Sequence, residues 1–169
     1  MFLQEAPSTV DLVAPGWCHY ANAQGTATFT GPEWLTSRLL TTLCDSSYIA
    51  LIFRDGLALF SVYLPDRGKV ERQYESALAE LAVAMRLARS AYSVRHFVLV
   101  GDWNVQLSRP SVIEDELNLE WGESVFGPNL PETADRRHCD RQDSVHSFCS
   151  QFNLVHGPSH LASPRWSAA

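Results

Sequence analysis

Phe97-Val98-Leu99-Val100-Gly101-Asp102-Trp103-Asn104 is the stretch on which the predicted fold and the predicted function both depend. Its four apolar residues lead directly into a turn signal, which predicts a buried β-strand. Gly101 allows the backbone to bend, or to be approached closely, where that strand ends. Asp102 and Asn104 are two residues apart, so in an extended or gently turning segment their side chains point to the same side.

A carboxylate beside a side-chain amide at the end of a strand suits chemistry on a phosphate. Asp102 can hold a water or accept its proton, and the Asn104 amide can hold a phosphate oxygen. The same residues also fit an ordinary Asp/Asn turn after a strand, which is common in α/β proteins. Two other stretches of the chain favour the chemical interpretation.

The sequence before this strand predicts a β-hairpin. Residues 48–53 and 57–63 are two apolar runs on either side of Arg54-Asp55-Gly56, and Asp-Gly between such runs indicates a two-residue hairpin turn. Both runs are apolar on both faces, so we expect them inside a sandwich of sheets. The second strand ends before Pro65, which cannot continue a ladder of hydrogen bonds.

A helix is predicted between the hairpin and the strand at 97–100. Its apolar residues fall on one stripe with helical spacing: Tyr74, Leu78, Leu81, Met85 and Ala88. We interpret the stripe as core and the charged residues off it as a solvated face. A hairpin, a helix and then a buried strand imply a sheet with its helix packed on one side.

The remaining segments give weaker expectations. Leu3-Gln4-Glu5 has the form of a strand end with Glu5 at its rim, residues 8–31 predict loops and short strands, and residues 33–43 predict a short helix or irregular structure. Residues 105–141 predict a long irregular stretch, which in a compact domain is more often functional than idle.

A second helix is predicted near the end of the chain. Asp143 is its expected N-cap and Asn153 its expected end. Its apolar face is formed by Val145, Phe148, Cys149 and Phe152. Residues 154–156 predict another short strand.

Composition limits the class of protein. The chain has 169 residues, of which 46% are hydrophobic, which suits one globular domain over residues 1–169. The net charge of −6 disfavours a general nucleic-acid coat protein but leaves a metal-dependent hydrolase open, because a bound cation supplies the local positive charge.

Targeting signals and cysteine spacing indicate an intracellular protein. The N-terminus has no basic region, so a signal peptide and secretion are not expected, and no apolar run approaches the roughly 20 residues that cross a bilayer. A nuclear location is compatible with the sequence but not indicated by it. Four scattered cysteines without CxxC spacing predict free thiols: Cys18, Cys44, Cys139 and Cys149.

Three motifs together resemble the endonuclease/exonuclease/phosphatase superfamily, the DNase I-like and apurinic-endonuclease-like metal phosphodiesterases. Leu3-Gln4-Glu5 resembles the family's Leu-Gln-Glu. Val62-Tyr63-Leu64-Pro65 resembles its Tyr-x-Pro strand end, and Gly101-Asp102-Trp103-Asn104-Val105 resembles its Gly-Asp-Phe/Leu-Asn-Val motif. Within the superfamily, the overall sequence pattern most resembles that of the endonuclease domains of non-LTR retrotransposons.

The resemblance implies a role for each motif residue. Glu5 would bind Mg²⁺, or Mn²⁺ in its place, and Tyr63 would line the phosphate site. Asp102 would position or deprotonate the attacking water, and Asn104 would contact the phosphate. Hard oxygen ligands suit Mg²⁺, which keeps most of its waters. The implied substrate is nucleic acid, with DNA favoured over RNA, and neither a membrane nor an obligate protein partner is implied.

The resemblance also implies an α+β fold, a four-layer α/β/β/α sandwich that is incomplete at both ends. The family's Asn-containing strand before Leu-Gln-Glu and its C-terminal Asp and Ser-Asp-His motifs have no counterpart here, and His156 and His160 lie in another context. We therefore expect a fragment with little activity, from a truncated gene or from a decayed mobile element. The alternatives are a catalytically dead remnant or interaction module, and an inositol-phosphate or lipid phosphatase.

Overall fold

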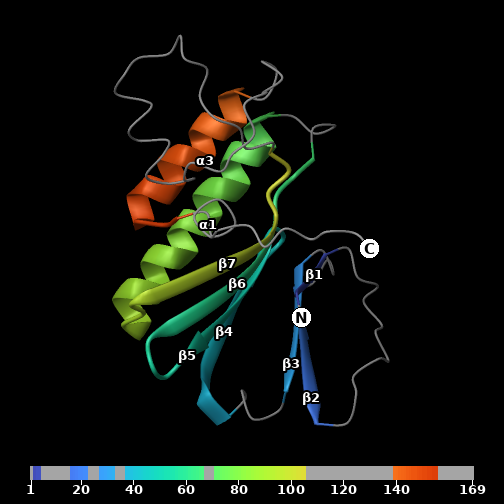
Figure 1. Ribbon diagram of the computed structural model, residues 1–169, viewed down its shortest axis with the longest axis vertical. Helices are drawn as coiled ribbons and strands as arrows, with labels where there is room; N and C mark the ends of the chain where they lie inside the picture. The colour runs from blue at the N-terminus through green and yellow to red at the C-terminus, as the bar shows by residue number, and fades with distance from the viewer. Residues whose placement is uncertain are drawn as a thin grey trace, which may run out of the picture. The chain divides into compact units, whose positions relative to one another are not determined.

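The computed structural model describes residues 2–4, 16–22, 27–32, 37–66, 71–105 and 139–155 (Figure 1). The chain divides into two compact units, Met1–Asn104 and Val105–Ala169, and each is described by itself. The first holds all the described strands and one helix, and the second holds the other described helix. The content is therefore mixed α and β, in agreement with the predicted α+β class. That all 169 residues form one domain stays a prediction.

The core of the first unit is a four-stranded mixed sheet. Its strands are β4 (Leu39–Asp45), β5 (Tyr48–Phe53), β6 (Leu57–Tyr63) and β7 (His96–Asp102), in the order β4-β5-β6-β7. β4, β5 and β6 run antiparallel, whereas β6 and β7 run parallel. A parallel pair needs a crossover, and α1 (Glu71–Tyr92) supplies it.

The predicted hairpin is confirmed in its strands and corrected in its turn. β5 and β6 have the expected bounds, and all six residues of β5 are buried, as expected for a strand inside a sandwich. The loop has three residues rather than two. The Gly56 amide donates to the Phe53 carbonyl at 3.2 Å, and Gly56 has a φ of 81°. A turn followed by a left-handed glycine is the usual three-residue hairpin connection, and it uses Gly56 as the bulge.

Helix α1 covers one face of this sheet with the predicted apolar stripe. All five residues of that stripe are buried: Tyr74, Leu78, Leu81, Met85 and Ala88. On the same face of the sheet, the Phe60 ring lies 5.9 Å from that of Tyr48 and 6.3 Å from that of Phe97. The Arg89 guanidinium of α1 lies over the Phe97 ring at 5.4 Å. Alternate residues of β5, β6 and β7 thus form the floor on which the helix packs.

The opposite face of the sheet packs against a second, three-stranded antiparallel sheet. It consists of β1 (Phe2–Gln4), β2 (Trp17–Ala21) and β3 (Ala27–Pro32) in the order β1-β3-β2. Tyr20 of β2 packs on a buried cluster that contains Leu51 and Phe53. The described residues of the first unit therefore form three layers, the two sheets and α1 (Figure 1).

Two expectations about strands are wrong. Residues 39–45 are β4, not a helix or irregular segment, because they pair along the length of β5. The strand at 97–100 is not wholly buried, since β7 is an edge of the described sheet and pairs only with β6. Val98 and Val100, on the face away from α1, are 44% and 37% exposed. The strand also continues through Gly101, where it was expected to stop, and Gly101 has a φ of 151°.

In the second unit, α3 (Cys139–Phe152) is the second predicted helix. Val145, Phe148, Cys149 and Phe152 are all buried, as the apolar spacing predicted. Asp143 is not the N-cap, because the helix begins four residues earlier, at Cys139. The Cys149 thiol is buried, which raises its pKa to about 12.

The end of α3 agrees with the prediction. Asn153 has a φ of 55°, and the Leu154 amide donates to the Cys149 carbonyl at 2.9 Å, which is a Schellman ending. Residues 154–155 are not a strand, and residue 156 lies outside the described residues. None of the described helices is both long enough and apolar enough to cross a membrane.

The buried stripe of α1 can be tested with two identical substitutions. Leu81 is fully buried, whereas Leu87 on the same helix is 44% exposed. We expect Leu81→Ala to lower the free energy of unfolding by about 2–5 kcal/mol, because it removes packing and leaves a cavity. Leu87→Ala should cost less than about 1 kcal/mol. Urea unfolding measures both, and equal losses would contradict this packing of α1.

His146 of α3 should make stability depend on pH. Its side chain is buried, and burial lowers its pKa from 6.5 to about 4. Between these values the unfolded chain takes up a proton that the folded chain excludes, so stability falls as the pH drops from 6.5 to 4. The loss should reach roughly 3 kcal/mol.

The measurement is the unfolding free energy across this pH range in the wild type and in His146→Gln, which cannot titrate there. The variant should lose this part of the pH dependence. The matched control is His96→Gln, because His96 is exposed. A His146→Gln protein with the pH profile of the wild type would show that His146 takes up its proton equally well in both states.

Candidate functional site

The register of β6 and β7 sets two of the predicted site residues side by side. Because the strands are parallel, their carboxyl ends meet at one edge of the sheet, and Tyr63 is the register partner of Asp102. Tyr63 is partly buried and Asp102 is exposed. Two residues that are 39 positions apart in the sequence thus end neighbouring strands at one edge.

The turn after β7 fixes Asp102 and Asn104 relative to each other. The Asn104 backbone amide donates to Oδ1 of Asp102 at 2.9 Å. Asn104 has a φ of 46°, in the left-handed region that asparagine tolerates better than most residues. This is an Asx turn, in which a carboxylate takes the place of a backbone acceptor. It holds the Asp102 carboxylate in one orientation at the edge of the sheet.

Both backbone groups of Leu64 hold this turn against the end of β6. The Leu64 amide donates to the Asp102 carbonyl at 2.9 Å. Its carbonyl accepts a hydrogen bond of 2.7 Å from Nδ2 of Asn104. Asn104 therefore both positions the turn and presents an amide at the same edge.

Helix α1 provides a further anchor. The hydroxyl of Tyr74 donates to the Trp103 carbonyl at 2.9 Å, although the Tyr74 side chain belongs to the buried stripe of the helix. The residue between Asp102 and Asn104 is thus held from the helix layer. The turn is positioned from two directions, by β6 and by α1.

The second sheet ends at the same edge. β1 and β2 both run antiparallel to β3, and their last residues, Gln4 and Ala21, pair with Ala27 and Thr28 at the start of β3. The carboxyl ends of β1 and β2 are therefore at one end of that sheet.

Asn22, which follows β2, connects that end to the four-stranded sheet. Its side chain is buried, and Nδ2 donates to the carbonyls of Asp45 and Ser46 at 2.8 and 3.0 Å. Those residues form the β4–β5 turn, and the next carbonyl, that of Ser47, accepts from the Tyr63 amide at 2.8 Å. The ends of β1, β2, β6 and β7 therefore share one end of the sandwich, which we name the carboxyl rim.

The structure brings together three of the four predicted site residues. Tyr63, Asp102 and Asn104 lie at the carboxyl rim. Glu5 lies outside the described residues, directly after Gln4, which ends β1 at this rim. In the part of the chain that the structure describes, no three His, Cys, Asp or Glu side chains gather around a possible metal position.

Sequence reasoning missed the residues that support the rim. Tyr74 was expected only as core, and its periodic spacing carries no signal of a hydroxyl that reaches Trp103. Asn22 lies in a stretch where only loops and short strands were predicted. A polar residue directly after a strand is too common to identify a buried link between sheets.

The described residues at the carboxyl rim include oxygen atoms of the kind that bind metal ions. Asp102 contributes an exposed carboxylate, and Tyr63 ends the neighbouring strand beside it. At the same end, burial and then the Asp45 charge raise the pKa of Tyr48, which begins β5, to about 12. Oxygen donors with one or two carboxylates suit Mg²⁺ and do not suit a soft metal.

Comparison of the chain with family models, with curated proteins and with solved structures gives no match. A functional assignment therefore depends on the sequence motifs and on the geometry of the carboxyl rim.

The two structural roles of Asn104 can be separated by substitution. Asn104→Gly loses the hydrogen bond to the Leu64 carbonyl, but glycine adopts a positive φ easily. Asn104→Ala loses the same hydrogen bond and also places alanine at a positive φ. We expect Asn104→Ala to be less stable than Asn104→Gly by about 1 kcal/mol, because alanine is strained in the left-handed region. Chemical denaturation measures the difference. If Asn104→Gly were the less stable protein, the left-handed turn would not be a constraint on this site.

Proposed function

We propose that this chain is a metal-dependent phosphodiester hydrolase that cleaves nucleic acid, with DNA favoured over RNA. The observation that carries the proposal is the pairing of Tyr63 with Asp102 at the carboxyl ends of two parallel strands. Asn104 is joined to the same edge through Leu64, and β1 ends at this rim one residue before Glu5. The described residues of the three motifs that suggest a nuclease thus lie at one end of the first unit.

The chemistry assigns a role to each side chain. Asp102 holds the attacking water and accepts its proton, a task for which its orientation is set by the Asn104 amide. Asn104 donates an N–H of its side-chain amide to a phosphate oxygen, where a fixed donor stabilises developing charge. Tyr63 lines the phosphate site from the neighbouring strand. Phosphate, water and base are thereby held in one geometry, which lowers the entropic cost of the reaction.

The proposed cofactor is Mg²⁺, with Mn²⁺ as a substitute, and its protein ligand is Glu5. The oxygen donors of the rim fit such an ion, since Mg²⁺ is usually bound by one or two carboxylates together with waters and substrate phosphate. When bound, the ion neutralises charge on the phosphate and supports formation of the nucleophile. The net charge of −6 is compatible with this role, because the cation carries the local positive charge.

The proposal includes the finer fold, a four-layer α/β/β/α sandwich that is incomplete at both ends. Support comes from the first unit, where α1 covers one sheet and the second sheet packs on its other face. β1 and β7 are both edges of their sheets among the described strands, so each sheet has a place for a further strand.

Nicking of supercoiled plasmid in Mg²⁺ tests the function. We expect Asp102→Ala to lower the nicking rate by at least about 100-fold, because the residue that activates the water is lost. Glu80→Ala is the matched control, since it removes one carboxylate from the exposed surface of α1 and should leave nicking unchanged. Replacing Mg²⁺ with excess chelator should abolish the activity of the wild type.

Activity of this chain is expected to be low, so the comparison is repeated in a chain extended at both ends. Loss of a catalytic partner commonly reduces activity by orders of magnitude, and the extension should restore it. Equal nicking by the wild type and Asp102→Ala would contradict the catalytic assignment. So would an extended chain without Mg²⁺-dependent activity.

A further inference from the structure

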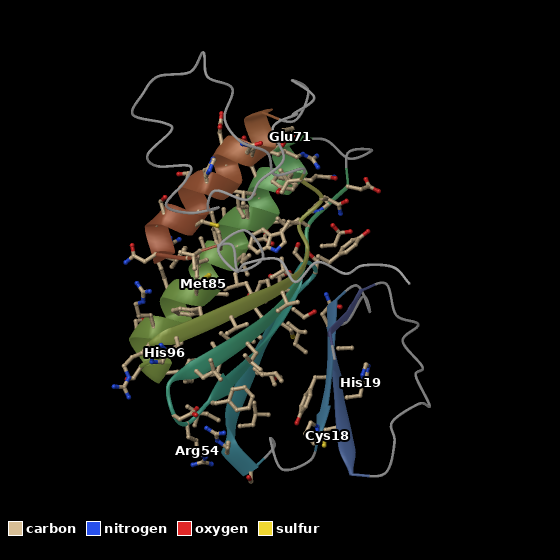
Figure 2. The ribbon with its side chains drawn as sticks, in the orientation of Figure 1. Cys18, His19, Arg54, Glu71, Met85 and His96 are labelled. Carbon is tan, nitrogen blue, oxygen red and sulfur yellow. The ribbon has the colours of Figure 1, made fainter. Side chains whose placement is uncertain are left out.

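The end of the four-stranded sheet opposite the carboxyl rim is rich in arginine. Arg54 lies in the β5–β6 turn, Arg38 lies just before β4, and Arg95 and His96 lie at the start of β7. All four side chains are exposed. We name this group of four residues the arginine end. Figure 2 shows Arg54 and His96 at this end and Glu71, at the start of α1, at the other.

The hairpin turn holds these residues together through the backbone. The Arg54 amide donates to the Arg38 carbonyl at 2.9 Å. The Gly56 carbonyl accepts from the amides of Arg95 and His96 at 2.8 and 3.1 Å. The Arg95 side chain also lies against the turn, with Nε 3.4 Å from where a side chain on Gly56 would begin. Backbone hydrogen bonds therefore fix the positions of these residues relative to one another.

The arginine end has an excess of positive charge. Asp55 is the acidic residue of the turn, and it pairs with Arg38. Within the described part of the chain, neither Arg54 nor Arg95 forms an ion pair with a carboxylate. Residues 81–101 contain no acidic residue at all, whereas they contain two further arginines, Arg86 and Arg89. The charge of this end is thus left for an external partner.

Acidic residues outnumber basic ones among the described residues at the carboxyl rim. The acidic residues there are Asp45 at the end of β4, Asp66 after β6, Glu71 at the start of α1, and Asp102, and Arg72 lies beside Glu71. β6 spans seven residues between the two ends, which separates them by roughly 20 Å at the usual rise per residue. An anion held at the arginine end is therefore not the phosphate that would lie beside Asp102.

We propose that the arginine end binds the phosphate backbone of a nucleic acid at a contact separate from the carboxyl rim. Guanidinium groups present planar pairs of donors that match phosphate oxygens, and this end carries three of them, on Arg38, Arg54 and Arg95. The choice of nucleic acid over an acidic peptide rests on the proposed function. Such a contact raises the local concentration of substrate without taking part in the chemistry.

Binding to a fluorescent DNA duplex without divalent metal tests this inference separately from cleavage. Each phosphate neutralised by an arginine contributes a slope of about −0.9 to the dependence of log affinity on log salt. Arg54→Ser/Arg95→Ser should therefore flatten the slope by about 2. Between about 50 and 200 mM salt, the wild type should lose about tenfold more affinity than the double variant.

Two controls make the result specific to this end. Arg54→Lys/Arg95→Lys keeps the charge and should keep most of the salt dependence. Arg72→Ser removes one exposed arginine from the first turn of α1, near the carboxyl rim, and should change binding less than Arg54→Ser. Thermal unfolding of each variant establishes that the fold is kept.

Several outcomes would overturn the inference. One is unchanged salt dependence in Arg54→Ser/Arg95→Ser, and another is an equal effect of Arg72→Ser and Arg54→Ser, which would indicate net charge alone. Displacement of the duplex by polyglutamate at equal charge would identify an acidic peptide as the partner. By contrast, failure of plasmid nicking by the extended chain, together with Arg54-dependent binding, would contradict the proposed function and support the anion contact.

Discussion

The parallel pairing of β6 and β7 is the constraint on which the site depends. An antiparallel partner would bring the start of one strand beside the end of the other, and Tyr63 would then lie far from Asp102. Parallel pairing requires a crossover, and the crossover is α1, whose Tyr74 also holds the Trp103 carbonyl. The element that makes the topology possible thus also supports the turn that carries the candidate catalytic residue.

Much of this framework follows from the sequence, because its signals are local and strong. The bounds of β5 and β6 come from two apolar runs around Asp55-Gly56, and the buried face of α1 comes from one period of apolar residues. Asn153 ends α3 because asparagine accepts a left-handed conformation. In each case one segment contains all the information needed to specify its own structure.

The errors arise where structure depends on distant residues. Residues 39–45 contain leucines and threonines that suit a helix or a strand, and their pairing with β5 decides between the two. Val98 and Val100 were expected to be buried and are exposed. The expectation failed because an apolar run does not reveal how many neighbouring strands a strand has. The links made by Asn22 and Tyr74 join layers that are far apart in the sequence. Local patterns cannot predict such contacts, whereas the motifs do predict that Tyr63 and Asp102 end strands.

The separation of charge in the first unit has a structural cause in the same crossover. A helix is stabilised by acids at its first turn and by bases at its last, and α1 has Glu71 and Arg89 in these places. The chain leaves β6 at the carboxyl rim and enters β7 at the other end, so α1 begins near the rim and ends near the arginine end. The last turn of α1 therefore adds a base to the arginine end, whereas Arg72 offsets the charge of Glu71 in the first turn. The net charge of −6 is a sum over the whole chain. It rules out a protein that is basic throughout, but it is compatible with one basic end.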